Sequence, residues 1–389
     1  MKGITVGIDI GTSMVRVFVT SKIDKNAQPA IVAIGTTMSR GVKHGYIVDR
    51  EMAVRSIQAA VRDAEQKSGI KIKRAYIAIN GVGLKSEVAI GSTTPSKADR
   101  EITNIDIQNA VINSEQAIDT ENRRPIHRIP FAYRLDGKEV MGKPTGMKGV
   151  KLEVKVLFIS CMNMHLEECV ESVTQAGVEV IDVIAGPLAE AGLVLGEQQR
   201  SVGSAVVNIG TETTSIAVFE NGLPVSVAVF PIGSADITKD IALGLKVPFE
   251  DADQIKKGRI PQEVSKRKLD DIISARLTDI FELVDSHLKK IKRSGLLPSG
   301  IYLTGGGIKF PFIENVAKDT LRLPIRTPDP DIWGNTANRL PDASYFVVAS
   351  LCNTEFKSIA EPETFEEGVA GIPARLKKFF KGILVQLMP

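Results

Sequence analysis

A short motif occurs twice in this chain, and the duplication restricts the possible folds more than composition does. Ile8-Asp9-Ile10-Gly11-Thr12 returns as Val207-Asn208-Ile209-Gly210-Thr211, an offset of 199 residues from Asp9 to Asn208. In both places β-branched and apolar runs flank a short Gly/Thr/Ser turn, which predicts a β-hairpin. Two such hairpins half a chain apart predict two similar lobes that face one another. Five shared residues alone leave coincidence between two ordinary hairpins open.

The hairpins carry residues suited to phosphate. A tight Gly/Thr/Ser turn points several backbone N–H groups at one place, and such a nest binds phosphate oxygens. Carboxylate oxygens suit Mg²⁺, so Asp9 is a candidate metal residue and Asn208 occupies the matching place. The strand Ile301–Thr304 ends in three glycines, which let a base or phosphate approach closely, although such a turn is also an ordinary loop. The predicted nucleotide-binding residues here are Gly11, Thr12, Ser13, Gly210, Thr211, Thr213, Gly305, Gly306 and Gly307.

Composition narrows the class of protein. The 389 residues are 43% hydrophobic and 24% charged, which suits a globular chain of two or more domains. The formal charge of the whole chain is +3, whereas residues 371–389 alone carry +4. The remainder is therefore close to neutral, which argues against a nucleic-acid-binding surface. Cys161, Cys169 and Cys352 fit no disulfide or metal spacing. Asp9 interrupts the first apolar run too early for a signal peptide, so we expect a cytoplasmic protein.

The C-terminal segment has the pattern of a surface-bound membrane helix. Residues 353–370 are acidic and predict a flexible linker. In residues 371–389 apolar side chains recur at three- and four-residue steps, with lysines beside and opposite them, which is typical of a helix lying in an anionic membrane surface. A helix docked on the chain's own body or on a neighbouring subunit is the alternative. The predicted membrane-binding residues are Leu376, Lys377, Lys378, Phe379, Phe380, Lys381, Ile383, Leu384 and Leu387.

The motifs together resemble the FtsA family of actin-like cell-division proteins. GIDIGTSMVRV resembles the first phosphate motif of that family, VVNIGTETTSIAVF the second, and YLTGGGIKFPF the adenosine motif. REIT and GMKGVKLEV resemble its own inserted subdomain. The resemblance implies an α/β fold with duplicated actin-like (ribonuclease H-like) lobes that bind ATP or ADP with Mg²⁺. It also implies head-to-tail filaments, attachment to the membrane, and contacts with the FtsZ C-terminal peptide and other divisome proteins.

The resemblance and the element pattern together give a domain organisation. We expect parts of the first lobe at residues 1–83, 163–200 and 341–352, and an FtsA-type inserted subdomain at 84–162. We expect the second lobe at 201–340, with its fourth subdomain at about 236–300. The acidic linker at 353–370 and the amphipathic helix at 371–389 complete the chain.

The second phosphate motif departs from the family pattern, Asp-Ile-Gly-Gly-Gly-Thr-Thr-Asp. Here Asn208 replaces the first aspartate, Ser215 replaces the last, and Glu212 brings an acid into the turn. The family's Glu-Pro-Leu is Gly186-Pro187-Leu188 here, ahead of a predicted helix over Ala189–Leu195. Glycine cannot orient an attacking water, so we predict slow or absent hydrolysis. An active ATPase is the alternative, as is a Glu212 that faces away or meets the metal.

Four further residues are assigned by their place in the family pattern. Asp253 and Lys256 correspond to contacts with ribose and base, or else form an exposed helix end. Lys268 and Arg276 are candidates for binding the FtsZ peptide, with a solvated helix face as the alternative. A PilM-type scaffold for pilus assembly competes with the division function, and the amphipathic tail argues against it.

Overall fold

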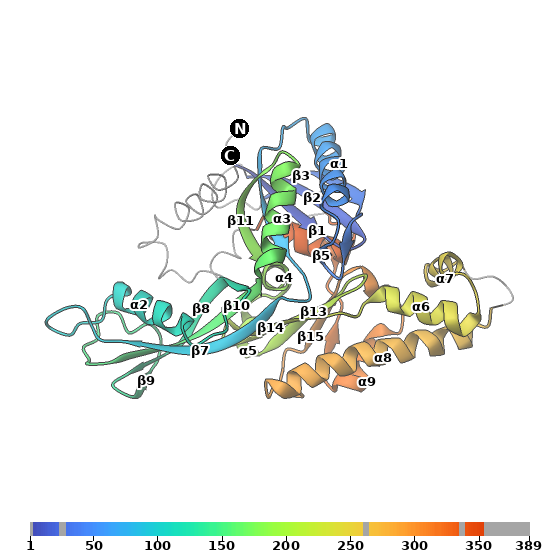
Figure 1. Cartoon of the computed structure of the whole chain (residues 1–389). Coiled ribbons are helices and arrows are strands. Elements are labelled where there is room, and N and C mark those ends of the chain that lie inside the picture. The colour runs from blue at the N-terminus through green and yellow to red at the C-terminus, as the bar shows by residue number, and fades with distance from the viewer. Residues whose placement is uncertain (1–2, 23–28, 260–263, 334–338, 354–389) are drawn as a thin grey trace. The chain divides into compact units, whose positions relative to one another are not determined.

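The structure is a computed structural model that describes residues 3–22, 29–259, 264–333 and 339–353 (Figure 1). The described residues form two compact units. The first holds residues up to 86, 122–126 and 159–353, and the second holds 87–121 and 127–158. Among the described helices, none combines the length and apolar content needed to cross a bilayer.

The first unit contains two sheets with the same strand order. One runs β11 (Glu179–Ala185), β6 (Arg74–Ile79), β1 (Ile4–Ile10), β2 (Met14–Ser21) and β3 (Ala30–Met38). In the other, which is part of a nine-stranded sheet, the matching five strands are β16 (Ile325–Arg326), β15 (Ile301–Thr304), β12 (Ser204–Ile209), β13 (Thr214–Glu220) and β14 (Leu223–Phe230). In each sheet three strands are antiparallel neighbours and the other two join in parallel. The predicted duplication of an α/β lobe is therefore confirmed.

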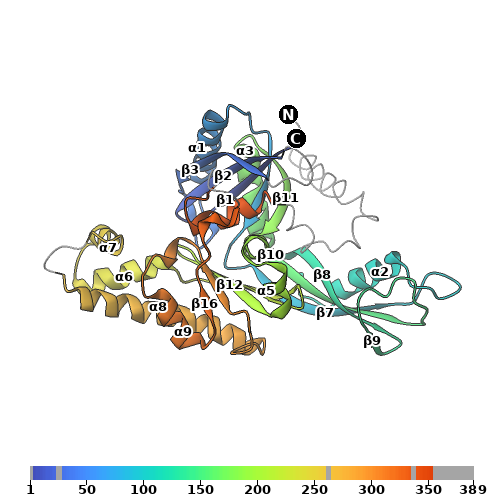
Figure 2. The same cartoon turned by 180° about the vertical axis from the view of Figure 1, so that it is seen from behind.

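Helices cover both faces of the first sheet. The helix α1 (Arg50–Ser68) packs on β2 and β3, as Figures 1 and 2 show. Gly35 permits this contact, because a Cβ there would lie 2.2 Å from the carbonyl oxygen of Ala60. On the other face α10 (Phe346–Ser350) contacts β1 and α4 (Gly186–Val194). Here Gly7 allows the approach, with Leu351 Cβ only 2.8 Å from where its own would be. Thus α10, although near residue 350, packs against the first sheet.

Other elements of the first lobe connect these layers. A two-strand hairpin, β4 (Val42–Lys43) and β5 (Tyr46–Ile47), precedes α1. The helix α3 (Asn163–Gln175) packs on α1 and β11, and the short α5 (Glu197–Val202) leads into the second lobe. Asp49 caps α1 by accepting a hydrogen bond from the Met52 N–H, and Gly69 ends it at φ +65°.

The second lobe is built on the long helix α8 (Lys266–Lys290). Its apolar side chains at helical spacing are buried against β12, β13 and β15. The helices α6 (Ser234–Leu245), α7 (Phe249–Lys256) and α9 (Ile313–Leu321) complete this layer. Short 3₁₀ turns lie at Gly306–Ile308, Pro330–Trp333 and Ala343–Tyr345.

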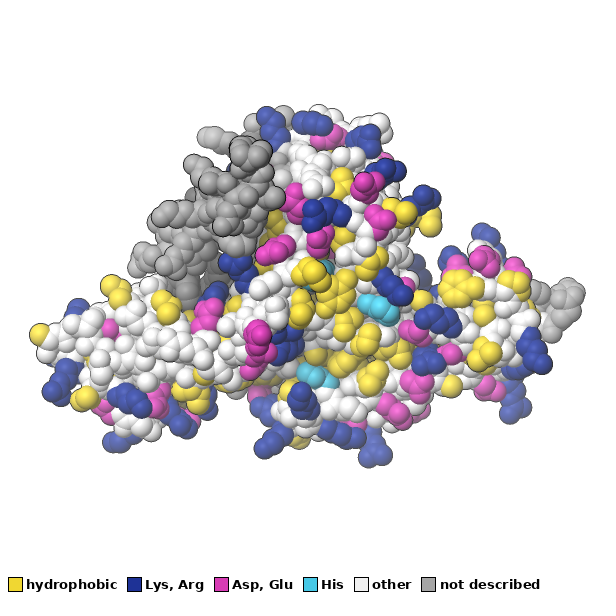
Figure 3. All heavy atoms as spheres, viewed as in Figure 1, with side chains coloured by type: hydrophobic (Ala, Val, Ile, Leu, Met, Phe, Trp, Pro, Cys, Tyr) yellow, Lys and Arg dark blue, Asp and Glu magenta, His cyan; other side chains and the backbone are white. Residues whose placement is uncertain are grey.

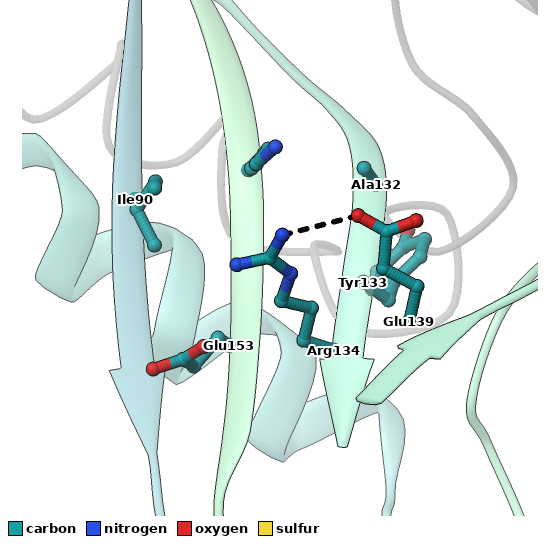
Figure 4. Close-up of a pocket in the computed structure, with 7 residues that line it drawn as sticks. Ile90, Ala132, Tyr133, Arg134, Glu139 and Glu153 are labelled. Carbon is teal, nitrogen blue, oxygen red and sulfur yellow. Dashed lines mark hydrogen bonds and ion pairs between the residues drawn. The ribbon is translucent and has the colours of Figure 1, made fainter. Parts of the chain in front are cut away.

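The described part of the second unit holds four neighbouring strands and one helix, and it lies within the segment predicted as an insert. Its strands run β7 (Lys85–Thr93), β10 (Leu152–Met162), β8 (Arg123–Leu135) and β9 (Lys138–Val140). The helix α2 (Asn104–Glu115) covers one face and begins with a capping box between Thr103 and Asp106. Its core includes Ile102, Ile107, Val111, Val154 and Phe158. The opposite face carries a small cavity of about 20 Å³ beside the Arg134–Glu139 ion pair, room for about one water (Figure 4).

Candidate functional site

The two hairpins have the same geometry. In the first, the N–H of Gly11 donates to the Met14 carbonyl at 3.1 Å, and Asp9 pairs with Arg16. In the second, the N–H of Gly210 donates to the Thr213 carbonyl at 2.8 Å, and Asn208 pairs with Ser215. A Cβ on either glycine would lie within 3.0 Å of that carbonyl oxygen. The five-residue sequence repeat is therefore a structural repeat with one register.

Asp9 lies at the end of β1 with polar partners around it. The residue is 5% exposed, and its Oδ1 accepts a hydrogen bond from Asn80 Nδ2 at 2.8 Å. Arg16 Nη1 lies 3.9 Å from Oδ2. Burial raises the pKa of Asp9, and the positive charge of Arg16 and the Asn80 hydrogen bond lower it in part. A cation at this carboxylate would oppose the effect of burial.

Asn80 also explains the glycine at position 186. A Cβ built on Gly186 would lie 1.7 Å from Asn80 Oδ1. The space that a glutamate would enter from α4 is thus filled by the amide that holds Asp9. The missing acid at position 186 is a change of packing as well as a loss of charge.

Asn208 meets a carboxylate that the sequence analysis did not identify. Its Nδ2 donates to both oxygens of Glu190, each at 2.9 Å. Glu190 is fully buried on α4, one helical turn beyond Gly186. Burial raises the pKa of Glu190 to about 7, the hydrogen bonds from Asn208 and Thr304 lower it, and the nearby charge of Asp9 adds to the rise. Asp9 and Glu190 are therefore close enough to interact.

Two of the three glycines after β15, Gly305 and Gly307, pack against the end of β12. Gly305 has φ +90°, and a Cβ there would lie 2.5 Å from both Asn208 Oδ1 and the Ile209 carbonyl oxygen. A Cβ on Gly307 would lie 2.6 Å from Ile209 Cγ2. Gly306 is less restricted, since its nearest neighbour is Ser344 Cβ at 3.7 Å. Close contact with β12 accounts for glycine at two of the three positions.

Both hairpin turns are joined to the turn between β4 and β5. The N–H of His44 donates to Glu212 Oε2 at 2.7 Å, and His44 Nδ1 lies 3.1 Å from the Glu212 carbonyl oxygen. The next N–H, of Gly45, donates to Thr12 Oγ1 at 3.2 Å. Two successive backbone donors of one turn thus hold one residue from each hairpin. Glu212 is directed at His44 in this arrangement.

The remaining hairpin residues have backbone roles. The carbonyl of exposed Ser13 accepts from the Ser39 N–H at 2.9 Å. The first N–H groups of α6 are used by the second turn: Ser234 donates to the Gly210 carbonyl at 2.9 Å and Ala235 to the Thr211 carbonyl at 2.7 Å. The N-terminus of α6 therefore fixes the second turn.

Lys256 also contacts the N-terminal turn of α6. Its Nζ donates to the Ser234 carbonyl at 3.0 Å and to Thr238 Oγ1 at 2.5 Å. Asp253 Oδ1 lies 3.4 Å from that Nζ, and Asp253 also pairs with Lys257. Burial lowers the pKa of Lys256, and the charge of Asp253 opposes this. These two predicted nucleotide residues therefore form one network with α6.

The two candidate partner-binding residues differ in their surroundings. Arg276 makes a two-pronged ion pair with Asp240, with contacts of 2.5 and 2.9 Å, and a further one with Asp279 at 3.2 Å. Lys268 is exposed in the first turn of α8. The predicted membrane-binding residues, Leu376 to Leu387, lie outside the described residues.

The donor set suits Mg²⁺ with a bound phosphate. Among the described residues, no three His, Cys, Asp or Glu side chains cluster as a protein-only metal site. Asp9 and Glu190 supply carboxylates and Asn208 an amide oxygen, which matches a cation that binds one or two carboxylates and keeps waters and phosphates. A further cavity in the described chain, of about 330 Å³, is lined by residues of α5 and of the segments at β15 and β16. Neither cavity includes a hairpin residue.

Sequence reasoning missed Asn80, Glu190 and His44. Asn80 directly follows β6, and Glu190 lies four residues after the glycine that replaces the family's glutamate. His44 lies in a Gly-rich turn without a distinguishing pattern. None of the three gives a signal as strong as the repeat.

Comparisons with known proteins agree on one family. The family model described as Cell division protein FtsA matches residues 205–350, and the SHS2 domain inserted in FTSA matches residues 80–160. The Cell division protein FtsA of Pseudomonas aeruginosa is 33% identical over 346 residues, 82% of each chain. That of Bacillus subtilis is 30% identical over 352 residues, 85% of this chain and 79% of the relative.

Solved structures share the fold. A PilM-PilN type IV pilus biogenesis complex aligns with a TM-score of 0.65 at 16% identity, over 90% of this chain and 97% of that one. MreB 5 of Spiroplasma citri bound to AMPPNP aligns at 0.52 and 14% identity, over 98% and 99%. At these identities the structures show an actin-like fold alone. The sequence relatives decide between division and pilus proteins: the chain belongs to the FtsA family and is an actin-like cell-division scaffold.

Proposed function

We propose that this chain binds ATP or ADP with Mg²⁺ at its two hairpins and tethers the FtsZ division ring to the membrane as a filament-forming scaffold. The observation that carries nucleotide binding is the shared register of the two hairpins, together with the β4–β5 turn that joins them. Backbone donors and hydroxyls from two such turns suit a chain of phosphates.

The residues present also suit the cation. Bound Mg²⁺ would neutralise phosphate charge. The chain's contribution is to hold Asp9 buried by way of Asn80 and Arg16, and to keep Asn208 fixed on Glu190. Asp253 and Lys256 support the second turn through α6, which places them to affect the nucleoside end indirectly.

Slow or absent hydrolysis follows from the surroundings of Gly186. Phosphoryl transfer to water needs a side chain that orients the water. Asn80 fills the space at position 186 and its amide is directed at Asp9. Phosphate release from Mg²⁺-ATP should therefore stay close to that of Asp9→Ala. Turnover well above this control would instead establish an active ATPase.

Direct binding tests the nucleotide proposal. Calorimetry with Mg²⁺-ATP and Mg²⁺-ADP should give micromolar affinity, and Asp9→Ala should weaken it. Absence of binding at millimolar nucleotide would refute the proposal and leave a scaffold governed by membrane and partners.

Membrane attachment is proposed from the sequence of residues 371–389. Each basic residue near an anionic surface contributes about 1 kcal/mol, and the apolar face adds buried area. Sedimentation with vesicles containing phosphatidylglycerol should carry the chain down, and Phe379→Ser with Phe380→Ser should release it. Lys378→Gln is the matched control, since it removes one charge from the opposite face. Equal vesicle binding by the wild-type chain, the double serine variant and Lys378→Gln would contradict the proposal.

Binding of FtsZ is proposed at α8. Because Arg276 is held by Asp240, exposed Lys268 is the better candidate for contact with an acidic peptide. Co-sedimentation with FtsZ should require the FtsZ tail peptide and should weaken with Lys268→Glu. Binding that is indifferent to the tail would favour a scaffold of another kind, such as a PilM-type one.

A further inference from the structure

The pair Glu190 and Asn208 places a buried carboxyl group where the sequence suggests that one was lost. Glu190 is fully buried, and its partners among the described residues are the Asn208 amide and the Thr304 hydroxyl. No lysine or arginine forms an ion pair with it in the described chain. A buried carboxylate without a cationic partner needs an explanation, because its desolvation is costly.

The identities of the two residues depend on one another. Asn208 Nδ2 lies 2.9 Å from each Glu190 oxygen, so an aspartate at 208 would place two carboxylates in direct contact. Two like charges at such a distance inside a protein repel strongly. The family's aspartate at this position and a glutamate at 190 are therefore incompatible, whereas amide and carboxylate fit in either order.

We propose that the negative charge of the second phosphate motif has moved from position 208 to Glu190, which together with Asp9 meets the cation that accompanies a nucleotide. The inference rests on the proposed nucleotide binding. The charge is displaced by about one hydrogen-bond length from the place of an aspartate. Mg²⁺ bound through its waters tolerates such a displacement, since it retains several waters at nucleotide sites. The second lobe thus keeps its acidic character despite the asparagine.

Exchange of the two residues tests the proposal. The variants are Glu190→Gln, Asn208→Asp and the double variant, which returns the charge to 208 and leaves an amide at 190. ADP binding is measured by calorimetry with Mg²⁺ and with EDTA, and the ratio of the two affinities reports the cation. Glu197→Gln, an exposed acid on α5, is the matched control.

Glu190→Gln should reduce the Mg²⁺ enhancement of ADP affinity at least about tenfold, which corresponds to about 1.4 kcal/mol. The double variant should restore it, and Glu197→Gln should not change it. An unchanged enhancement in Glu190→Gln, or a double variant no better than Glu190→Gln, would overturn the proposal. Wild-type affinity that is equal with Mg²⁺ and EDTA would also overturn it, while leaving nucleotide binding intact.

Thermal unfolding without nucleotide separates this inference from the proposed function. Asn208→Asp should lower the melting temperature by on the order of 5 °C, and adding Glu190→Gln should recover most of it. If wild-type protein binds no ADP in either condition, the proposed function and the cation role are both refuted. Additive melting shifts would refute the exchange itself, whatever the nucleotide result.

Discussion

Glu212 offers the sharpest test of how the hairpins meet phosphate. Its carboxylate accepts the His44 N–H at 2.7 Å while Thr12 accepts the adjacent Gly45 N–H, so a negative charge sits where the two turns come together. A nucleotide at the hairpins brings phosphate charge towards it. We therefore expect Glu212→Gln to strengthen Mg²⁺-ATP binding more than Mg²⁺-ADP binding, because ATP carries the additional charge.

The magnitude follows from Coulomb's law and from partial exposure. Two unit charges 4 Å apart repel by about 1 kcal/mol in water and about 4 kcal/mol at an effective dielectric of 20. Glu212 is half-buried, which places the effect between these limits. A value near 1.4 kcal/mol gives about a tenfold gain in affinity for ATP. Calorimetry with both nucleotides measures it, and Glu282→Gln, an exposed acid on α8, is the control.

The same carboxylate also acts as a tether, which Glu212→Ala tests separately. A hydrogen bond to a charged group contributes about 1.5–3 kcal/mol, and loss of the tether should speed hydrogen exchange of the His44 amide about tenfold or more. Unchanged ATP and ADP affinities in Glu212→Gln would refute the electrostatic reasoning. Weaker binding that depends on Mg²⁺ would show instead that Glu212 meets the metal.

Other predictions concern buried positions. Burial lowers the pKa of His165 from 6.5 to about 4, so between these values the unfolded chain binds a proton that the folded chain excludes. His165 should therefore lower the free energy of unfolding in urea by up to about 3 kcal/mol as pH drops from 6.5 to 4. His165→Phe should remove this share and leave that of buried His127, whose pKa is also lowered to about 4. Gly35→Ala should lower the free energy of unfolding in urea by more than about 2 kcal/mol, because its Cβ would lie 2.2 Å from the Ala60 carbonyl oxygen. Gly306→Ala, whose Cβ would meet only Ser344 Cβ at 3.7 Å, should stay within about 1 kcal/mol. Gly186→Glu should destabilise the chain without raising phosphate release, and adding Asn80→Ala should relieve the destabilisation.

The fold was predictable where its determinants are local. Each hairpin is specified by β-branched runs around a short turn, and α8 by apolar residues at helical spacing, so both are readable from consecutive residues. The matching strand order of the two sheets follows from the repeat. The helix α4 begins at Gly186 and not at Ala189 as the pattern predicts, because Pro187 is accommodated in its first turn.

The contacts of the site depend on distant segments and were not predictable. Asn80 reaches Asp9 across 71 positions, and His44 reaches Glu212 across 168. The sequence shows an asparagine at 208 and indicates a weakened metal site. In the structure Glu190 lies beside Asn208, so a carboxyl group is still present next to position 208.

Shared backbone geometry does not give the two hairpins equal chemistry. The parallel neighbour of β1 pairs Ala78 with Asp9 and continues into Asn80, whose amide holds the carboxylate. The matching neighbour of β12 pairs Thr304 with Asn208 and continues into glycines. In the first lobe, β6 therefore continues into a polar side chain, that of Asn80. In the second lobe, β15 continues into glycines, and the nearby carboxyl group is that of Glu190 on α4. Glu190 of α4 lies beside Asn208 and close enough to Asp9 to interact with it. Asn208→Asp alone should therefore destabilise the site, because it places two carboxylates in contact. Positions 190 and 208 have to change together.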